Sequence, residues 1–571
     1  MTISVLKFEK ISEKDSHRGS NHMSSNEDIY NQPTEAVTGG NHISQVPTID
    51  TIDQAASVVP RKRKISRRAL IGASIAGMAG AAIGGYALEQ VAQKGGLSNI
   101  EQLIQHNGMN AIFHLNDPLA TAPQIGHLLR RGGFGARSEE LSVYQNLGFN
   151  GAVDRLINYQ QVSEDDTENR LKAMNLNLVK PTDQQRWWLL RMAWTQRPLL
   201  EKMTLFWHGM LVSSYHKVGG ARAYERMMVQ NQFFRKHAFD TFDNILLGIT
   251  ADPAMLFYLD LTKSTKKAPN ENYARELMEL FTLGLGHYTQ QDVYEGAAAL
   301  TGWHVKGLTS HYLPHDHNDL PKTFLGQRGN FDYKDVVRIL TNHPATPWFI
   351  CRKLFTFFVY ENPTNDDLRP LVDTYVQSGH NMGQVMRTLL LSPQFSSAKA
   401  YRSRVKSPVE YMVGAYRALN VQGSGDGLPT ISLLMGQTLF DPPNVAGWPG
   451  DKVSALWLNS GTWMTRVNYI DLLLSRGIFT SKERPSPVDL QSIVDANNID
   501  SPEHFVDYFT SFLLDGVVDK ERRAQYIDFF ITKDTSRGNA HITLKNGQSY
   551  PLNRVRGTLY LIMASPEYQL N

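Results

Sequence analysis

The chain has very little cysteine and almost no excess of charge. Among its 571 residues Cys351 is the only cysteine, so no disulfide bond forms within the chain. Lysine and arginine number 58 against 55 aspartates and glutamates, a formal net charge of +3. Such a balance gives no reason to expect nucleic acid as a partner. Cys351 sits in an apolar helical pattern at 348–355, which predicts a buried thiol rather than a nucleophile.

Several catalytic signatures are missing as well. No Gly-x-Ser-x-Gly sequence occurs in a strand–turn–helix setting, and the run 423–425 (GSG) has the composition of a loop. The glycine-rich loops that cradle phosphates and the cysteine motif that attaches haem are also absent from the sequence. These absences argue against an elbow-type serine hydrolase, a P-loop nucleotide-binding protein and a c-type cytochrome.

A basic segment followed by an apolar one is the clearest local signal. Residues 61–68 (RKRKISRR) are mostly basic, and residues 69–88 are uncharged and rich in alanine and glycine. This order is typical of an export signal or a membrane anchor. Arg67 and Arg68, followed by apolar residues, resemble the twin-arginine export motif. The pattern predicts the twin-arginine export machinery as a partner and an extracytoplasmic location.

The fate of this segment has two interpretations. About 20 residues are enough to span a bilayer, so 69–88 would form a transmembrane helix that anchors the protein if it stays attached. Small residues before Ala87 alternatively suit cleavage after it, which would release a secreted protein. Residues 1–60 are polar and lack a sustained apolar period, which predicts a disordered leader. That leader is either a cytoplasmic tail or the product of a start site placed too early.

The remainder of the chain is predicted to be mainly α. Residues 89–121 have the pattern of a spacer, and apolar residues recur at helical spacing through most of 122–571. We expect one large multi-helix domain with a small β-hairpin and long ordered loops. The hairpin is predicted at 541–550, around Asn546-Gly547. The three prolines of 441–450 (DPPNVAGWPG) predict an ordered loop there.

Local signals place several helix ends. Asp252-Pro253 predicts a helix start, and Thr289 with Asp292 resembles a capping box. Asn270 is predicted to cap a helix over 271–283.

A set of motifs in fixed order resembles the bacterial domain-of-unknown-function-1800 family, from about His127 to the end of the chain. The motifs are 127–135 (HLLRRGGFG), 206–208 (FWH), 252–255 (DPAM), 270–293, 299–303 (ALTGW), 322–326 (KTFLG) and 442–448 (PPNVAGW). The function of this family is not established, so the resemblance implies fold and location more than chemistry. Members often carry twin-arginine signals. Many members read Trp-His-Asn-His where this chain has 207–210 (WHGM), which removes one histidine of a pair.

Glu276 is the first candidate for chemistry. Glu271, Arg275 and Glu279 are spaced four residues apart and are expected to form a charge ladder on one helix face. Glu276 lies off this ladder, nearer the apolar side. One interpretation makes it a general base or metal ligand, and the other a member of a structural ion pair.

A histidine-rich segment is the second candidate. His304, His311, His315, Asp316, His317 and Asp319 fall within sixteen positions. Imidazole and carboxylate together suit a divalent transition metal such as zinc, so His315, Asp316 and His317 are candidate ligands and His304 a candidate catalytic residue. The segment matches no defined zinc signature. A polar surface loop with solvated histidines is the alternative.

His208 and Trp448 complete the candidates. His208, next to Trp207 on an apolar helix, is either catalytic or a core histidine bonded to the backbone. Trp448 is either exposed for ligand stacking or packed beneath its own loop.

Two functions follow from these residues. The first is an exported or membrane-anchored, metal-assisted hydrolase-like enzyme that acts on an envelope or extracellular polymer, with Glu276, His208 and His304 as catalytic candidates. The second is a non-catalytic binding or assembly protein of the cell surface, whose extracellular ligand the sequence does not name.

Overall fold

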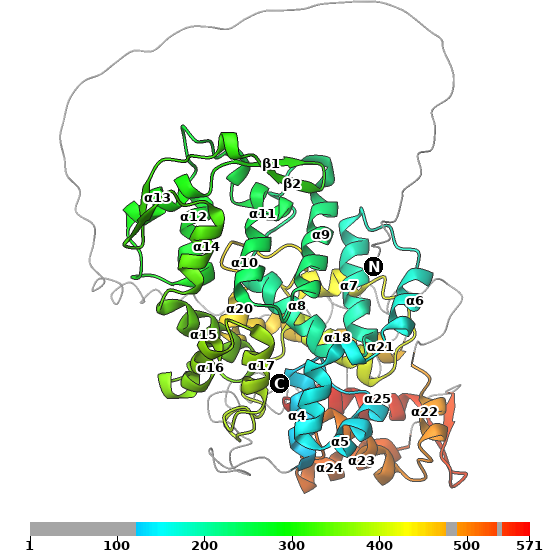
Figure 1. Cartoon of the computed structure of the whole chain (residues 1–571). Helices are drawn as coiled ribbons and strands as arrows, with labels where there is room; N and C mark the ends of the chain where they lie inside the picture. The colour runs from blue at the N-terminus through cyan, green and yellow to red at the C-terminus, as the bar shows by residue number, and fades with distance from the viewer. Residues whose placement is uncertain (1–120, 476–487, 534–539) are drawn as a thin grey trace, which may run out of the picture. The chain divides into compact units, whose positions relative to one another are not determined.

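The computed structural model describes residues 121–475, 488–533 and 540–571 (Figure 1). Helices dominate these residues, and their strands form three antiparallel sheets of two strands each. The mainly α class predicted from the sequence is confirmed.

The helices follow one another with short connections. In the first half of the chain they are α4 (Thr121–Arg131), α5 (Ser138–Ile157), η3 (Tyr159–Gln161), α6 (Asp165–Ala173), α7 (Pro181–Trp194), α8 (Pro198–Met210), η4 (Gly220–Arg222), α9 (Ala223–Lys236), α10 (Phe242–Thr250), α11 (Pro253–Tyr258), η5 (Leu261–Lys263), α12 (Asn272–Glu276), η6 (Leu277–Thr282) and α13 (Gln290–Ala299). After the first two hairpins they are α14 (Tyr333–Thr341), α15 (Ala345–Phe358), α16 (Asn365–Gln377), α17 (Met382–Leu390), α18 (Pro408–Ala418), α19 (Leu428–Leu434), α20 (Pro449–Lys452), η8 (Ser454–Trp457), α21 (Ser460–Ser475), α22 (Leu490–Ala496), α23 (Pro502–Leu513), α24 (Lys520–Ile531), α25 (Leu552–Met563) and η9 (Glu567–Gln569).

Three hairpins supply the strands. In β1 (Trp303–Lys306) and β2 (Thr309–Tyr312), His304 stands opposite His311, and β3 (Lys322–Phe324) pairs with β4 (Gln327–Gly329). The short η7 (Pro314–Asp316) lies between these two hairpins. The hairpin predicted at 541–550 is confirmed as β5 (His541–Thr543) and β6 (Ser549–Pro551), with Gly547 in the left-handed region at φ 84°.

Side chains cap several helices as their sequences predict. Asp252 accepts a hydrogen bond from the backbone N–H of Met255 at 2.9 Å and so begins α11. Thr289 and Asp292 form the expected capping box at the start of α13. These local hydrogen bonds satisfy N–H groups that the helix itself leaves unpaired.

The helix predicted over 271–283 differs from expectation. It begins at Asn272, because the Asn270 side chain accepts the N–H of Asn272 at 3.0 Å in a turn before the helix. It then widens into the π-helix η6 at Leu277–Thr282. Such π-turns are rare and frequently occur at functional sites. Glu276 is the last residue before this change of pitch.

The first described helices lie against the last ones (Figure 1). α4 and α5 pack together, and the ion pair between Arg130 of α4 and Asp515 after α23 joins them to the C-terminal helices. Segments almost 400 residues apart therefore share one core.

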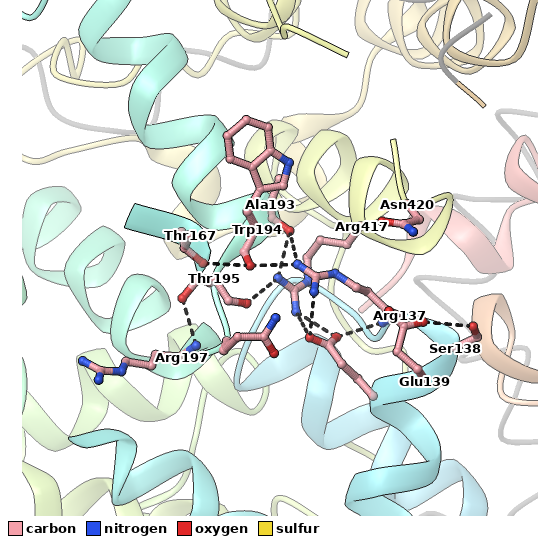
Figure 2. A network of polar contacts seen from close by, with 12 residues as sticks. Arg137, Ser138, Glu139, Thr167, Ala193, Trp194, Thr195, Arg197, Arg417 and Asn420 are labelled. Carbon is pink, nitrogen blue, oxygen red and sulfur yellow. Dashed lines mark hydrogen bonds and ion pairs between the residues drawn. The ribbon is translucent and has the colours of Figure 1, made fainter. Parts of the chain in front are cut away.

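Arg417 of α18 joins the start of α5 and the end of α7 (Figure 2). Its Nη2 binds both carboxylate oxygens of Glu140 at 2.8 Å, and its Nη1 donates to the carbonyls of Ala193 and Thr195 at 3.0 Å. Arg137 donates to the neighbouring carbonyl of Trp194 at 2.8 Å. The guanidinium thereby closes the C-terminal end of α7 against the start of α5.

The prediction for Cys351 agrees with its place in α15. Its side chain is completely buried, and burial raises the pKa of the thiol. A protonated, inaccessible thiol packs as a small apolar group.

The expected transmembrane helix requires correction. In residues 121–475, 488–533 and 540–571, no helix is both long enough and apolar enough to cross a membrane. The stretch 69–88, on which that expectation was based, lies outside the described residues, as do Arg67 and Arg68 and the predicted leader at 1–60.

Candidate functional site

His208 lies in the core near the end of α8. Its side chain is buried, and burial lowers the pKa of the imidazole to about 3. Its Nε2 accepts a hydrogen bond from the backbone N–H of Phe440 at 3.1 Å. The rings of Trp188 and Trp448 meet it edge-on, at 5.4 and 5.5 Å between centroids. A neutral, enclosed ring with its acceptor nitrogen occupied favours the packing interpretation of His208 over the catalytic one.

Trp448 is buried in the core rather than exposed to solvent. It is only 1% exposed, which decides against ligand stacking on this ring. The adjacent Gly447 has a φ of 82°, and a Cβ there would lie 2.3 Å from the carbonyl oxygen of Gly209. Glycine is required at 447 because the two backbones approach so closely. The motifs at 206–208 and 442–448 therefore meet, although more than 200 residues separate them.

The histidine-rich segment forms an exposed surface beside β1. The Nε2 of His304 lies 2.8 Å from Oδ2 of Asp316, and the Nε2 of His315 lies 3.6 Å from the same oxygen. His317 turns away, with its Nδ1 3.2 Å from the carbonyl oxygen of Thr301. Across the described part of the chain, no three His, Cys, Asp or Glu side chains stand close enough together to hold a metal ion. The geometry thus brings His304, His315 and Asp316 together but separates His317 from them.

Glu276 has an unusual environment for a glutamate. Its carboxylate is half-buried and has no hydrogen-bond or ion-pair partner among the described residues. Burial and the nearby charge of Glu279 raise its pKa. The expected ladder is present only in part, since Arg275 binds Glu271 at 3.1 Å while Glu279 accepts the hydroxyl of Tyr288 at 2.5 Å. The structural ion pair considered for Glu276 is therefore not found.

A second carboxylate, Asp441, influences the same tyrosine as Glu276 through its charge. Burial raises the pKa of Tyr258 to about 12, and the charges of Asp441 and Glu276 both add to that shift. Asp441 accepts a hydrogen bond from the Ser214 hydroxyl, and its Oδ2 lies 2.9 Å from Nε2 of His216. We call Ser214, His216, Tyr258, Glu276 and Asp441 the Asp441 site.

The Asp441 site opens to solvent on the His216 side. The side chain of His216 is 77% exposed, whereas that of Asp441 is 21% exposed. A solute can therefore reach the imidazole and one edge of the carboxylate. Ser214 and His216 both bind the aspartate, so the order of contacts differs from a catalytic Ser–His–Asp triad, in which histidine lies between the other two.

Cations border the site beyond Tyr258. Lys217 has its Nζ 2.9 Å from Oδ2 of Asp260, and Lys263 binds the other oxygen of this carboxylate at 2.7 Å. Asn272, at the start of α12, donates to Asp260 at 2.9 Å. Although burial opposes the shift, these three hydrogen bonds lower the pKa of Asp260. Asp260 thus stays ionised and holds the loop after α11 against the helix that carries Glu276.

The sequence alone identified only Glu276 in this site. Asp441 stands within a motif that was noted for its prolines and tryptophan, but its neighbours were not predictable. Ser214 and His216 belong to 211–217 (LVSSYHK), which matches no catalytic pattern, and Tyr258 ends an ordinary apolar helix. Their common feature, contact with a loop more than 180 residues away, is not visible in the sequence.

The structure is that of a mainly helical protein in which Glu276 and Asp441 are two partly exposed carboxylates. The chain belongs to a family of proteins of unknown function, DUF1800, whose model matches residues 127–570. Neither the curated proteins nor the solved structures include a match to the chain. The resemblance drawn from the sequence motifs is confirmed.

Proposed function

We propose that this protein is an exported enzyme that cleaves an envelope or extracellular polymer by general acid–base catalysis at the Asp441 site. One observation carries the proposal. Glu276 and Asp441 come from elements 165 residues apart, yet both act on the Tyr258 phenol, and Glu276 has no partner among the described residues. Two carboxylates held in different environments are the arrangement that separates the roles of acid and base.

The different surroundings of Glu276 and Asp441 support different roles for the two carboxylates. Glu276 is the proton donor, since half-burial and Glu279 keep its carboxyl protonated to a higher pH than an ordinary glutamate. Asp441, held by Ser214 and His216, is the base that accepts a proton from water. The donated proton goes to the leaving oxygen of the cleaved bond. Paired carboxylates serve the hydrolysis of glycosidic bonds in this way, so a polysaccharide is the favoured polymer.

The test is product release from isolated envelope polysaccharide, measured as new reducing ends. Glu276→Gln and Asp441→Asn should each lower the rate at least about 100-fold, because general acid–base groups contribute on that order. Asp366→Asn is the matched control, since Asp366 is an exposed carboxylate at the start of α16, away from the site. Polymer binding by the wild type without any release of reducing ends would refute catalysis and support the binding-protein alternative.

The proposed location is extracytoplasmic, through the twin-arginine machinery. It is supported by the basic run at 61–68 and by the pair Arg67-Arg68. Replacing both arginines with lysine keeps the charge and removes the motif, so the protein should accumulate in the cytoplasmic fraction. Arg61→Lys is the control and should leave export unchanged. Equal export of all three proteins would argue against the twin-arginine route.

A further inference from the structure

Two basic segments meet in the interior and take no part in the Asp441 site. They are the HLLRR sequence at 127–131 in α4 and the RSRVK sequence at 402–406 before α18. We propose that Arg130, Arg402 and Lys406 form a buried binding site for a small tetrahedral oxyanion such as inorganic phosphate or sulfate.

Arg130 presents an unused binding edge. It is 5% exposed, and its Nη1 donates to Oδ1 of Asp515 at 2.5 Å. Its Nε and Nη2 are buried and have no hydrogen-bond partner among the described residues. These two nitrogens form the fork with which arginine binds two oxygens of a phosphate or carboxylate. A buried donor pair without an acceptor is costly, so a missing acceptor is the simplest explanation.

The neighbouring cations lack a matching number of carboxylates. Arg402 donates to the other oxygen of Asp515 at 3.3 Å, so Arg130 and Arg402 share a single carboxylate that is 1% exposed. Lys406 places its Nζ 3.7 Å from the centre of the Tyr568 ring and makes no ion pair among the described residues. Arg130 and Arg402 thus share one carboxylate, and Lys406 lies near enough to respond to the charges of both arginines and of Asp515.

The other nearby carboxylates are already bound. Glu410 pairs with Lys202, and Glu567 pairs with Arg522. Their charges still favour the charged forms of Arg402 and Lys406, but within the described part of the chain no hydrogen bond or ion pair joins either carboxylate to Arg130, Arg402 or Lys406. Burying uncompensated charge of one sign is strongly unfavourable, and arginine cannot relieve it by losing a proton.

An oxyanion fits this environment better than a water molecule does. It accepts from the Arg130 fork with two oxygens and brings the negative charge that the three cations lack. Burial and the charges of Arg130 and Arg402 lower the pKa of Lys406 well below its ordinary value. A bound anion opposes that shift and keeps the ammonium protonated.

The first experiment asks whether an anion is retained. The purified full chain is exchanged into phosphate- and sulfate-free buffer, denatured, and the released anions are measured by ion chromatography. We expect stoichiometric phosphate or sulfate. The melting temperature of the emptied protein should then rise by roughly 2 °C or more in phosphate over chloride at equal ionic strength. Absence of a retained oxyanion, together with equal melting in both salts, would overturn the proposal.

The second experiment locates the site. Lys406→Met removes the ammonium while keeping a long apolar side chain, and it should abolish the extra stabilisation by phosphate. In chloride this variant should melt no lower than the wild type, because an uncompensated buried charge has been removed. Lys334→Met is the matched control: Lys334 also lies over a tyrosine, 5.7 Å from the ring centre, but is exposed. A full phosphate response in the Lys406 variant would contradict the assignment.

Discussion

At the scale of single residues, the raised pKa of Glu276 has a consequence for stability as well as for the proposed catalytic role. A raised pKa means that the folded protein holds the Glu276 proton more tightly than the unfolded chain does. The resulting stabilisation is fully present below the ordinary value of 4.5 and declines as the pH rises toward the shifted value. The folded protein is less stable with a charged Glu276 than with a protonated one. A residue in a proposed active site commonly carries such a cost in stability.

Glu276→Gln should therefore be tolerated by the fold, although it is expected to abolish the proposed activity. We expect its melting temperature to equal or exceed that of the wild type at pH 7, with the difference disappearing at pH 4. Thermal unfolding of both proteins at the two pH values checks this. A variant that is clearly less stable at pH 7 would show that the carboxylate makes a favourable contact in the folded protein.

Asp252 gives a second pH-dependent prediction at this scale. Burial raises its pKa to about 7, although the N–H of Met255 and the amide of Gln230 oppose the shift. The associated stabilisation is complete below the ordinary value of 3.8, declines above it, and is gone above about pH 7. Asp252→Asn keeps the helix cap but not the titration. Its stability relative to the wild type should therefore rise between pH 4 and 8, which urea unfolding at both values would reveal.

At the scale of elements, the loop at 441–448, before α20, contacts the end of α8. The backbone of Gly447 touches that of Gly209, and this contact places Asp441 beside Ser214 and His216. The geometry of the proposed catalytic pair is thus set by glycine as much as by the carboxylates.

Gly447→Ala should displace this loop. The added Cβ would lie 2.3 Å from the carbonyl oxygen of Gly209, so we expect a destabilisation of more than about 2 kcal/mol and loss of activity. Gly436→Ala is the matched control, because its φ of 91° is equally unusual but no atom lies within 4 Å of the added carbon. Gly436→Ala should lower the free energy of unfolding by only about 1 kcal/mol. Similar melting temperatures for the two variants would show that the backbone contact is unimportant.

At the scale of the whole molecule, buried arginines hold distant segments together. Arg417 joins α18 to α7 and to the start of α5, and Arg130 joins α4 to Asp515, which follows α23. The planar guanidinium of Arg417 satisfies several acceptors at once, which lysine cannot reproduce.

Arg417→Lys should therefore lower the free energy of unfolding strongly. It removes both side-chain hydrogen bonds to Glu140 and the donor to the Thr195 carbonyl, so that only the contacts of Arg137 remain there, and about 3–5 kcal/mol of unfolding free energy should be lost. Chemical denaturation measures this loss. Arg328→Lys, on the exposed strand β4, is the control and should change stability by less than about 0.5 kcal/mol. A small effect at Arg417 would show that water replaces the guanidinium.

The sequence by itself determined the mainly α class, the hairpin around Asn546-Gly547 and the caps at Asp252 and Thr289. These features depend on residues only a few positions apart, so local hydrogen bonding and apolar spacing are enough to predict them. The helix that begins at Asn272 rather than at the predicted residue, and its π-turn, show the limit, because Asn270 uses its side chain in a local turn before the helix and the sequence carries no signal for the change of pitch.

Only the tertiary structure decided which polar groups meet. The Asp441 site joins residues from about 214 to 441, and the buried cation cluster joins α4 to residues 402–406 and Asp515. Such contacts come from the way helices pack, which the spacing of residues along the chain does not encode. The same packing buried His208 and Trp448 and left Glu276 half-exposed. The degree of burial in turn shifts the pKa of His208 and of Glu276.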